Sequence, residues 1–149
     1  MDLVLRNSTA RAETSVTQRN RAMTKSRILI AEDHPDSREA LRELLEAFGF
    51  EVIEAMNGAE AVRAALEQKP RLILMDVMMP EKDGFQAIRE IRQNPELAGT
   101  PIIAVTAMDG ARELALHAGA DDYVRKPIDI RRLIGLVNGW LSREKIERT

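Results

Sequence analysis

The stretch RLILMDVMMP, residues 71–80, decides how this chain is organised. Its apolar run, residues 72–75, is typical of a strand that is covered on both faces. Asp76 follows the run at once, and Pro80 indicates that the chain turns soon afterwards. Because a buried carboxylate is costly unless other groups offset its charge, Asp76 directs attention to the residues that follow the other apolar runs.

Similar apolar runs alternate with helical patterns from Arg27 onward. In residues 34–49, for example, Leu41, Leu44 and Leu45 recur at the spacing that places them on one helix face. The predicted strands are residues 27–31, 50–55, 71–76, 101–107 and 122–126, and the predicted helices are residues 34–49, 57–70, 84–93, 111–119 and 129–143.

Five repeats of strand and helix predict an α/β fold. The strands ILIA and IIAV, residues 28–31 and 102–105, are apolar throughout, so helices should cover both faces of the sheet. Right-handed crossovers then give a doubly wound parallel sheet. In such sheets, ligands bind beyond the carboxyl ends of the strands.

The length of 149 residues suits one domain, which we expect over residues 27–143, followed by a short tail, residues 144–149. No apolar run approaches the ~20 residues that a membrane-spanning helix needs, so we expect no membrane span. The absence of cysteine excludes disulfides and thiolate metal sites, and it agrees with the cytoplasmic location that we expect.

Residues 1–26 are rich in Ser, Thr, Asn, Gln and Arg without a sustained apolar period, so we expect a disordered basic extension. Three alternatives stay open: Met23 is the biological start, the leader targets an organelle, or it binds a partner. Residues 1–27 carry a net charge of +4, so the overall charge of −2 leaves −6 for the remainder. An acidic body of this kind is a poor binder of nucleic acid.

Polar residues end four of the predicted strands: Glu32 and Asp33, Asp76, Thr106, and Lys126. Crowded carboxylates repel one another unless cations are present, and one divalent cation together with Lys126 would balance the three acids. A set of oxygen ligands without His or Cys suits Mg²⁺. The sequence therefore predicts a magnesium site at this edge of the sheet.

A carboxylate beside Mg²⁺ can attack a phosphoryl group and form an aspartyl phosphate, which gives Asp76 a chemical task. Mg²⁺ and Lys126 would offset the charge on the phosphoryl oxygens, and Thr106 could donate a hydrogen bond to one of them. A separate base is unnecessary because the carboxylate is already ionised.

Four motifs resemble the receiver domain of two-component response regulators. They are the acidic pair in IAEDHP, the Asp in LMDVMMPEKDG, the hydroxyl in VTA and the Lys–Pro in AGADDYVRKP. Each motif is weak alone, but four in this order, each at its own strand end, are highly specific. The resemblance covers residues 26–143 and implies a flavodoxin-like sheet with five strands in the order 2-1-3-4-5 and five helices.

The resemblance implies a phosphorylation-dependent signalling switch rather than an enzyme, with only self-phosphorylation from small donors. A histidine kinase or a histidine phosphotransfer protein would phosphorylate Asp76. Thr106 and Tyr123 match the family's switch pair, so phosphorylation would reshape the face of the fourth helix, fifth strand and fifth helix, to which an unknown protein target would bind. The implied ligands of Mg²⁺ are Glu32, Asp33, Asp76 and the main-chain carbonyl of Met78.

Only 22 residues follow Pro127, and the last predicted helix uses most of them. We therefore expect no output domain that binds DNA or catalyses a reaction. The chain should act as a stand-alone receiver that docks onto its partners, without direct DNA binding.

Three features depart from the family pattern. Glu32 replaces the commoner Asp, which should alter metal affinity and leave function intact. The interval of 13 residues from Thr106 to Gly119 is shorter than is typical, which predicts a shortened fourth helix and an unusual partner face. Met78 and Met108 flank the site and cannot orient an attacking water, which predicts slow self-dephosphorylation.

Competing classes are disfavoured by particular residues. Phosphohydrolases of the haloacid dehalogenase superfamily also use an Asp after a strand, but they carry a second Asp where this chain has Met78. A receiver-like module that binds partners without phosphorylation would not need Asp76 and Lys126. A nucleotide-binding Rossmann domain would need a glycine-rich loop in place of residues 31–37.

Overall fold

The computed structural model describes residues 25–79 and 82–148, with side chains as far as Arg143. The extension expected for residues 1–26 therefore lies almost wholly outside the described residues. None of the helices in the described ranges is long and apolar enough to cross a membrane.

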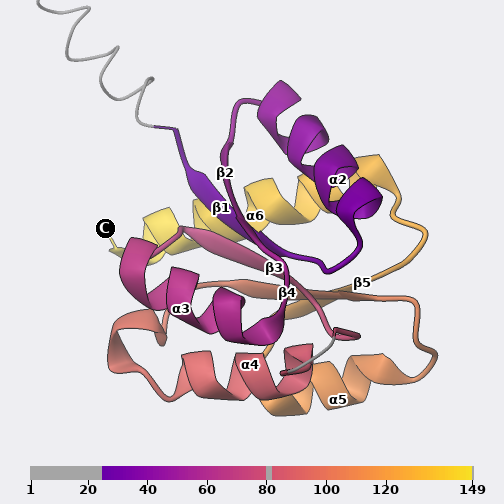
Figure 1. Ribbon diagram of the computed structural model, residues 1–149. Helices are drawn as coiled ribbons and strands as arrows, with labels where there is room; N and C mark the ends of the chain where they lie inside the picture. The colour runs from indigo at the N-terminus through magenta and orange to yellow at the C-terminus, as the bar shows by residue number, and fades with distance from the viewer. Residues whose placement is uncertain (1–24, 80–81, 149) are drawn as a thin grey trace, which may run out of the picture.

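Strands and helices alternate along the chain, as Figure 1 shows, close to where the sequence predicts them. The elements are β1 Arg27–Ala31, α2 Pro35–Ala47, β2 Glu51–Ala55, α3 Gly58–Gln68, β3 Leu72–Asp76, α4 Gly84–Arg92, the 3-10 helix η1 Pro95–Leu97, β4 Ile102–Thr106, α5 Ala111–Ala118, β5 Asp122–Arg125 and α6 Ile130–Arg148.

The five strands form one parallel sheet in the order β2-β1-β3-β4-β5. This order confirms the predicted doubly wound, flavodoxin-like α/β fold. At the carboxyl edge, Ala31 pairs with Met75 and Asp76 pairs with Val105. Neighbouring strands thus end at nearly the same level, so the residues that follow them share one edge.

Helices cover both faces of the sheet, with α2 and α6 on one face and α3, α4 and α5 on the other (Figure 1). Successive residues of β1 and β3 serve opposite faces. Ile28, Ile30, Leu72 and Leu74 belong to the cluster beneath α2 and α6, and Leu29, Ala31, Ile73 and Met75 belong to the cluster beneath the other three helices. Burying one large apolar side chain stabilises the fold by about 1.5–3 kcal/mol, so these two layers hold the sheet edge in place.

Side chains near the carboxyl edge cap three of the helices. His34, Asn57 and Asp83 each accept a hydrogen bond from a backbone N–H in the first turn of α2, α3 and α4, respectively. Such caps fix where a loop ends and a helix begins. α5 differs, because Gly110 precedes it in a left-handed conformation (φ 74°) and supplies no side-chain cap.

The observed lengths of α6 and α5 can be compared with the lengths predicted from the sequence. α6 continues to Arg148, so the prediction that the last helix ends at about Arg143 was wrong. The polar residues after Arg143 lack an apolar period, which is why the pattern ended too early. α5, the fourth of the five helices, has eight residues and is the shortest α-helix in the described part of the chain. An unusual partner face remains a prediction.

Arg92, at the end of α4, joins three segments of the chain beside β4. Its guanidinium donates hydrogen bonds to the main-chain carbonyls of Leu97 at 3.0 Å, Thr100 at 2.8 Å and Gly119 at 2.8 Å. It also pairs with the carboxylate of Asp121 at 2.6 Å. One side chain thus hydrogen-bonds main-chain carbonyls in the segment before β4 and in the segment before β5.

We expect Arg92→Ala to lower the free energy of unfolding by about 2–4 kcal/mol, because part-buried acceptors and a carboxylate lose their donor. Urea unfolding followed by Trp140 fluorescence measures the change. Arg89→Ala, an exposed position on the same helix, is the control and should change the free energy by less than about 0.5 kcal/mol. Equal losses in the two variants would contradict the role given to Arg92.

Candidate functional site

Four strands deliver polar side chains to the carboxyl edge of the sheet. Glu32 follows β1, Asp76 ends β3, Thr106 ends β4, and Lys126 follows β5. Lys126 and Glu32 are 94 positions apart in the sequence, yet the Nζ of one lies 2.8 Å from the Oε1 of the other. The parallel sheet therefore assembles these side chains from distant parts of the chain.

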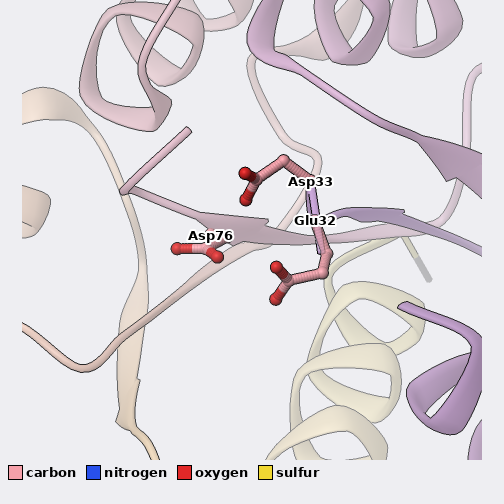
Figure 2. Close-up of side chains that lie close together, drawn as sticks. All are labelled: Glu32, Asp33 and Asp76. Atoms are coloured by element: carbon pink, nitrogen blue, oxygen red, sulfur yellow. The ribbon is translucent and has the colours of Figure 1, made fainter. Parts of the chain in front are cut away.

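The carboxylates of Glu32, Asp33 and Asp76 form a cluster at the ends of β1 and β3 (Figure 2). One oxygen from each carboxylate lies within 4.8 Å of the other two. Glu32 and Asp76 are each only 5% exposed, whereas Asp33 is exposed. The cluster thus combines two buried charges with one that faces solvent, and it is open to a cation on that side.

Lys126 connects the two buried carboxylates. Its Nζ donates to Glu32 Oε1 at 2.8 Å and to Asp76 Oδ2 at 3.1 Å. Its main-chain N–H donates to the carbonyl of Thr106 at 2.9 Å, which fixes the start of the segment after β5 against β4. A short, charge-assisted contact to each carboxylate makes Lys126 part of the site rather than a surface charge.

Burial and charge shift the pKa values within the cluster. Burial, with the nearby charge of Glu32, raises the pKa of Asp76 to about 6, although the N–H of Met78 and the ammonium of Lys126 oppose the rise. Burial acts on Glu32 too, but hydrogen bonds from Lys126 and the His34 N–H hold its pKa below its usual value. Burial would lower the pKa of Lys126, but the two carboxylates outweigh it and raise this pKa. Of the two buried carboxylates, Asp76 is therefore the one whose charge is less well compensated.

The loop after Asp76 is held close to it. The N–H of Met78 donates to Asp76 Oδ1 at 2.9 Å, and the N–H of Gly84 donates to the carbonyl of Val77 at 3.2 Å. A Cβ on Gly84 would lie 2.3 Å from the main-chain oxygen of Asp76, so only glycine allows α4 to begin this close to β3. The glycine thus keeps the loop tight around the carboxylate.

Thr106 and Tyr123 both contact Met108, in the loop between β4 and α5. Thr106 is fully buried, and its Oγ1 accepts a hydrogen bond from the Met108 N–H at 3.0 Å. The half-buried Tyr123 directs its hydroxyl toward the Met108 carbonyl at 3.5 Å, the upper limit for a hydrogen bond. Both side chains therefore contact the same loop residue, so a movement of one would change the surroundings of the other.

Methionine side chains line the solvent side of the cluster. Met78, Met79 and Met108, together with Phe85, border a hollow of about 430 Å³ that also touches Asp33. Met78 is 55% exposed. The approach to the site from this side is consequently apolar apart from the carboxylates themselves.

A second, larger groove of about 650 Å³ reaches the cluster between α2 and α6. Its walls are mostly apolar and include Leu41, Leu44 and Ile128, and Asp76 and Lys126 also line it. The cluster is therefore bordered by two hollows, the smaller at Asp33 and the larger at Asp76.

Every sequence-predicted site residue lies at this edge of the sheet, but they form two groups. Glu32, Asp33, Asp76 and Lys126 meet directly, whereas Thr106 and Tyr123 meet through Met108. Sequence reasoning missed Arg38, which binds the carbonyl of Glu32 from one turn inside α2. The only signal for Arg38 was its place after the acidic pair, which does not distinguish it from other polar residues of the predicted helix.

Comparison with known proteins decides the family. The sequence profile of the response regulator receiver domain matches residues 28–138 of this chain. The chain belongs to this family. As a receiver domain, it places an acidic cluster and a lysine at the carboxyl edge of its sheet.

Curated relatives match this receiver domain over nearly their whole length. The polar-differentiation response regulator DivK of Brucella anthropi is 39% identical over 122 residues, which span 80% of this chain and 98% of that protein. Among solved structures, the receiver domain of the sensor histidine kinase PA1611 from Pseudomonas aeruginosa PAO1 is 37% identical with a TM-score of 0.75, covering 79% of this chain and 98% of that one. In that structure a magnesium ion is coordinated in the active site cleft.

A CheY-like receiver domain protein from Methanospirillum hungatei JF-1 has a similar structure at lower sequence identity. It is 27% identical with a TM-score of 0.77, and the match covers 83% of this chain and 98% of that one. The fold of this receiver domain is thus shared with proteins that differ from it at most positions.

Asp76→Asn should raise the free energy of unfolding at pH 7.5 by roughly 1–3 kcal/mol in the absence of divalent cations. The pKa of Asp76 rises on folding from 3.8 to about 6, so the folded protein holds this proton more tightly than the unfolded chain. Stability is therefore lost as Asp76 ionises with rising pH, and the amide avoids that loss.

Urea unfolding at pH 7.5 and at about pH 3.5 measures this effect. The greater free energy of unfolding of Asp76→Asn should vanish at the lower pH, which lies below the unfolded-state pKa of 3.8, because Asp76 is then largely protonated in both states. Glu51→Gln, at an exposed position of β2, is the control. An advantage that is the same at both pH values would contradict the assignment to an uncompensated charge.

Proposed function

We propose that this receiver domain is a phosphorylation-dependent switch in which Asp76 accepts a phosphoryl group from a histidine kinase or a histidine phosphotransfer protein. One observation carries the proposal: three carboxylates and the ammonium of Lys126 converge from three strands, and Lys126 bonds Asp76 directly. We assign this activity to residues 27–143.

Mg²⁺ fits the residues that are present. Among the described side chains, only Lys126 bonds carboxylates of this cluster, those of Glu32 and Asp76, so a single positive charge accompanies three negative ones. A divalent cation would complete the balance, and oxygen ligands of this kind suit Mg²⁺. The proposed ligands are Glu32, Asp33, Asp76 and the main-chain carbonyl of Met78. When bound, the ion would neutralise charge on the transferred phosphoryl group.

The protein's own groups account for the transfer. An oxygen of Asp76 forms a bond to phosphorus while the bond from phosphorus to the donor's imidazole nitrogen breaks, and the imidazole keeps the electron pair. Lys126, already 3.1 Å from Asp76 Oδ2, is positioned to hold a phosphoryl oxygen. Thr106 would donate its hydroxyl hydrogen to another oxygen, which requires a small movement of its loop.

That movement would carry the effect of phosphorylation from Asp76 to the protein surface. Thr106 and Tyr123 share the Met108 loop, so a shift of Thr106 toward a phosphoryl group alters the surroundings of the Tyr123 ring. The face made by α5, β5 and α6 would change with it, and there an unidentified target protein would bind. Moving a switch from 1:99 to 99:1 requires about 5.5 kcal/mol of differential stabilisation, within reach of a few charge-assisted hydrogen bonds.

The direct test is incubation with Mg²⁺ and acetyl phosphate, followed by intact-mass measurement. The wild type should gain one phosphoryl group, the gain should require Mg²⁺, and Asp76→Asn should gain none. Glu51→Gln serves as the control for a carboxylate outside the site. Lack of a wild-type adduct, or an equal adduct on Asp76→Asn, would overturn the proposal.

The methionine lining predicts a long-lived phosphoryl group. Met78 is half exposed beside Asp76 and offers no polar group to orient a water, so Met78→Asn should speed the loss of the phosphoryl group about tenfold. Phe48→Asn, at 52% exposure and before the start of β2, at the opposite edge of the sheet, is the control. The decay of the phosphorylated mass with time measures both rates, and a Met78→Asn decay equal to that of the control would contradict the role of the lining.

A further inference from the structure

Arg38 lies in α2, outside the acidic cluster, yet it contacts the peptide that carries the cluster. Its NH1 donates to the main-chain carbonyl of Glu32 at 2.9 Å, and its Nε donates to Glu54 Oε1 on β2 at 3.0 Å. The side chain is only 15% exposed, and its contact with the Glu32 carbonyl is partly buried. A single guanidinium therefore ties the loop after β1 to the neighbouring strand.

The carbonyl that Arg38 binds belongs to the peptide unit joining Glu32 to Asp33. The N–H of Glu32 already donates to the Ala55 carbonyl at 3.0 Å, so the Arg38 contact fixes the other side of the same residue. Because both the N–H and the carbonyl of Glu32 are hydrogen-bonded, the backbone direction after β1 is fixed. That direction determines the position of the Asp33 Cα and Cβ atoms.

Asp33 needs such support more than the other acids do. Lys126 holds both Glu32 and Asp76, but no group in the described part of the chain bonds the exposed carboxylate of Asp33. Its position therefore depends on the backbone beneath it. A metal ligand that hangs from a loosely held loop costs affinity, because binding must then order the loop.

We propose that Arg38 is a positioning residue for the metal site: through the Glu32 carbonyl and Glu54 it holds the loop that presents Asp33 to Mg²⁺. This inference rests on the proposed Mg²⁺ site. Partners of this outer kind typically contribute 10- to 100-fold to metal affinity, so Arg38→Ala should raise the Kd for Mg²⁺ by about tenfold.

Arg42 provides a matched control one turn further along α2. It also pairs with Glu54, at 3.2 Å, and with Glu46 at 3.1 Å, but it makes no contact with Glu32. Arg42→Ala thus removes an arginine and a bond to the same glutamate without releasing the loop. Its Kd for Mg²⁺ should stay within about twofold of the wild type.

Arg38→Lys separates position from charge. Lysine keeps the positive charge but lacks the planar fork that reaches Glu32 and Glu54 together, so positioning predicts a Kd between those of the wild type and Arg38→Ala. If Arg38 acted only by its charge, it would repel Mg²⁺, and Arg38→Ala would bind the ion more tightly. The two explanations therefore predict opposite changes in the alanine variant.

Isothermal titration with MgCl₂ measures the Kd values of the wild type and the three variants, with urea unfolding as a check on folding. Phosphorylation by acetyl phosphate at increasing Mg²⁺ gives a second readout. In Arg38→Ala the Mg²⁺ concentration for half-maximal rate should rise by the same factor as the Kd, while the rate at saturating Mg²⁺ stays within about twofold. A general loss of structure would lower that saturating rate as well.

Each outcome decides something. A weakened Kd in Arg38→Ala, an intermediate one in Arg38→Lys and an unchanged one in Arg42→Ala support the positioning role. Equal Kd values in wild type and Arg38→Ala, tighter binding in Arg38→Ala, or equal weakening in Arg42→Ala overturn it. If the wild type itself binds no Mg²⁺, the proposed function fails first, and the titration shows this before any variant is compared.

Discussion

The ammonium of Lys126 lies between the buried carboxylates of Glu32 and Asp76, and the rest of the site depends on that contact. Two acids that are each 5% exposed and share one edge of a sheet could not both remain charged without a cation between them. Lys126 reaches them because β5 ends beside β4, and β4 beside β3. Its single charge is shared between the two acids and compensates Asp76 only in part, which makes the site receptive to a second cation.

The parallel sheet creates this arrangement, and its sequence signal was strong. Apolar runs such as residues 72–75 alternate with helical periods, and right-handed crossovers leave few other topologies. The positions of Glu32, Asp76 and Lys126 followed from the rule that strands of such a sheet end at one edge. These residues could be predicted because strand ends are local features of the sequence, and the parallel topology then brings the residues that follow the strands to one edge of the sheet.

The contacts between side chains and main-chain carbonyls could not be predicted in this way. Arg38 and Arg92 each bind carbonyls from other segments, and an arginine on a helix surface gives no sign of such a partner. The His34 cap of α2 and the extension of α6 to Arg148 were likewise missed. All four depend on geometry between elements or on weakly patterned polar residues, which carry little periodic signal.

Locating the phosphoryl group tests the central claim most directly. After reaction with Mg²⁺ and acetyl phosphate, borohydride reduces an aspartyl phosphate to homoserine, and peptide mass mapping finds the altered residue. We expect homoserine at Asp76 alone, with Asp33 and Asp83 unchanged. Conversion at either of those residues, or at none, would contradict the assignment of Asp76 as the acceptor.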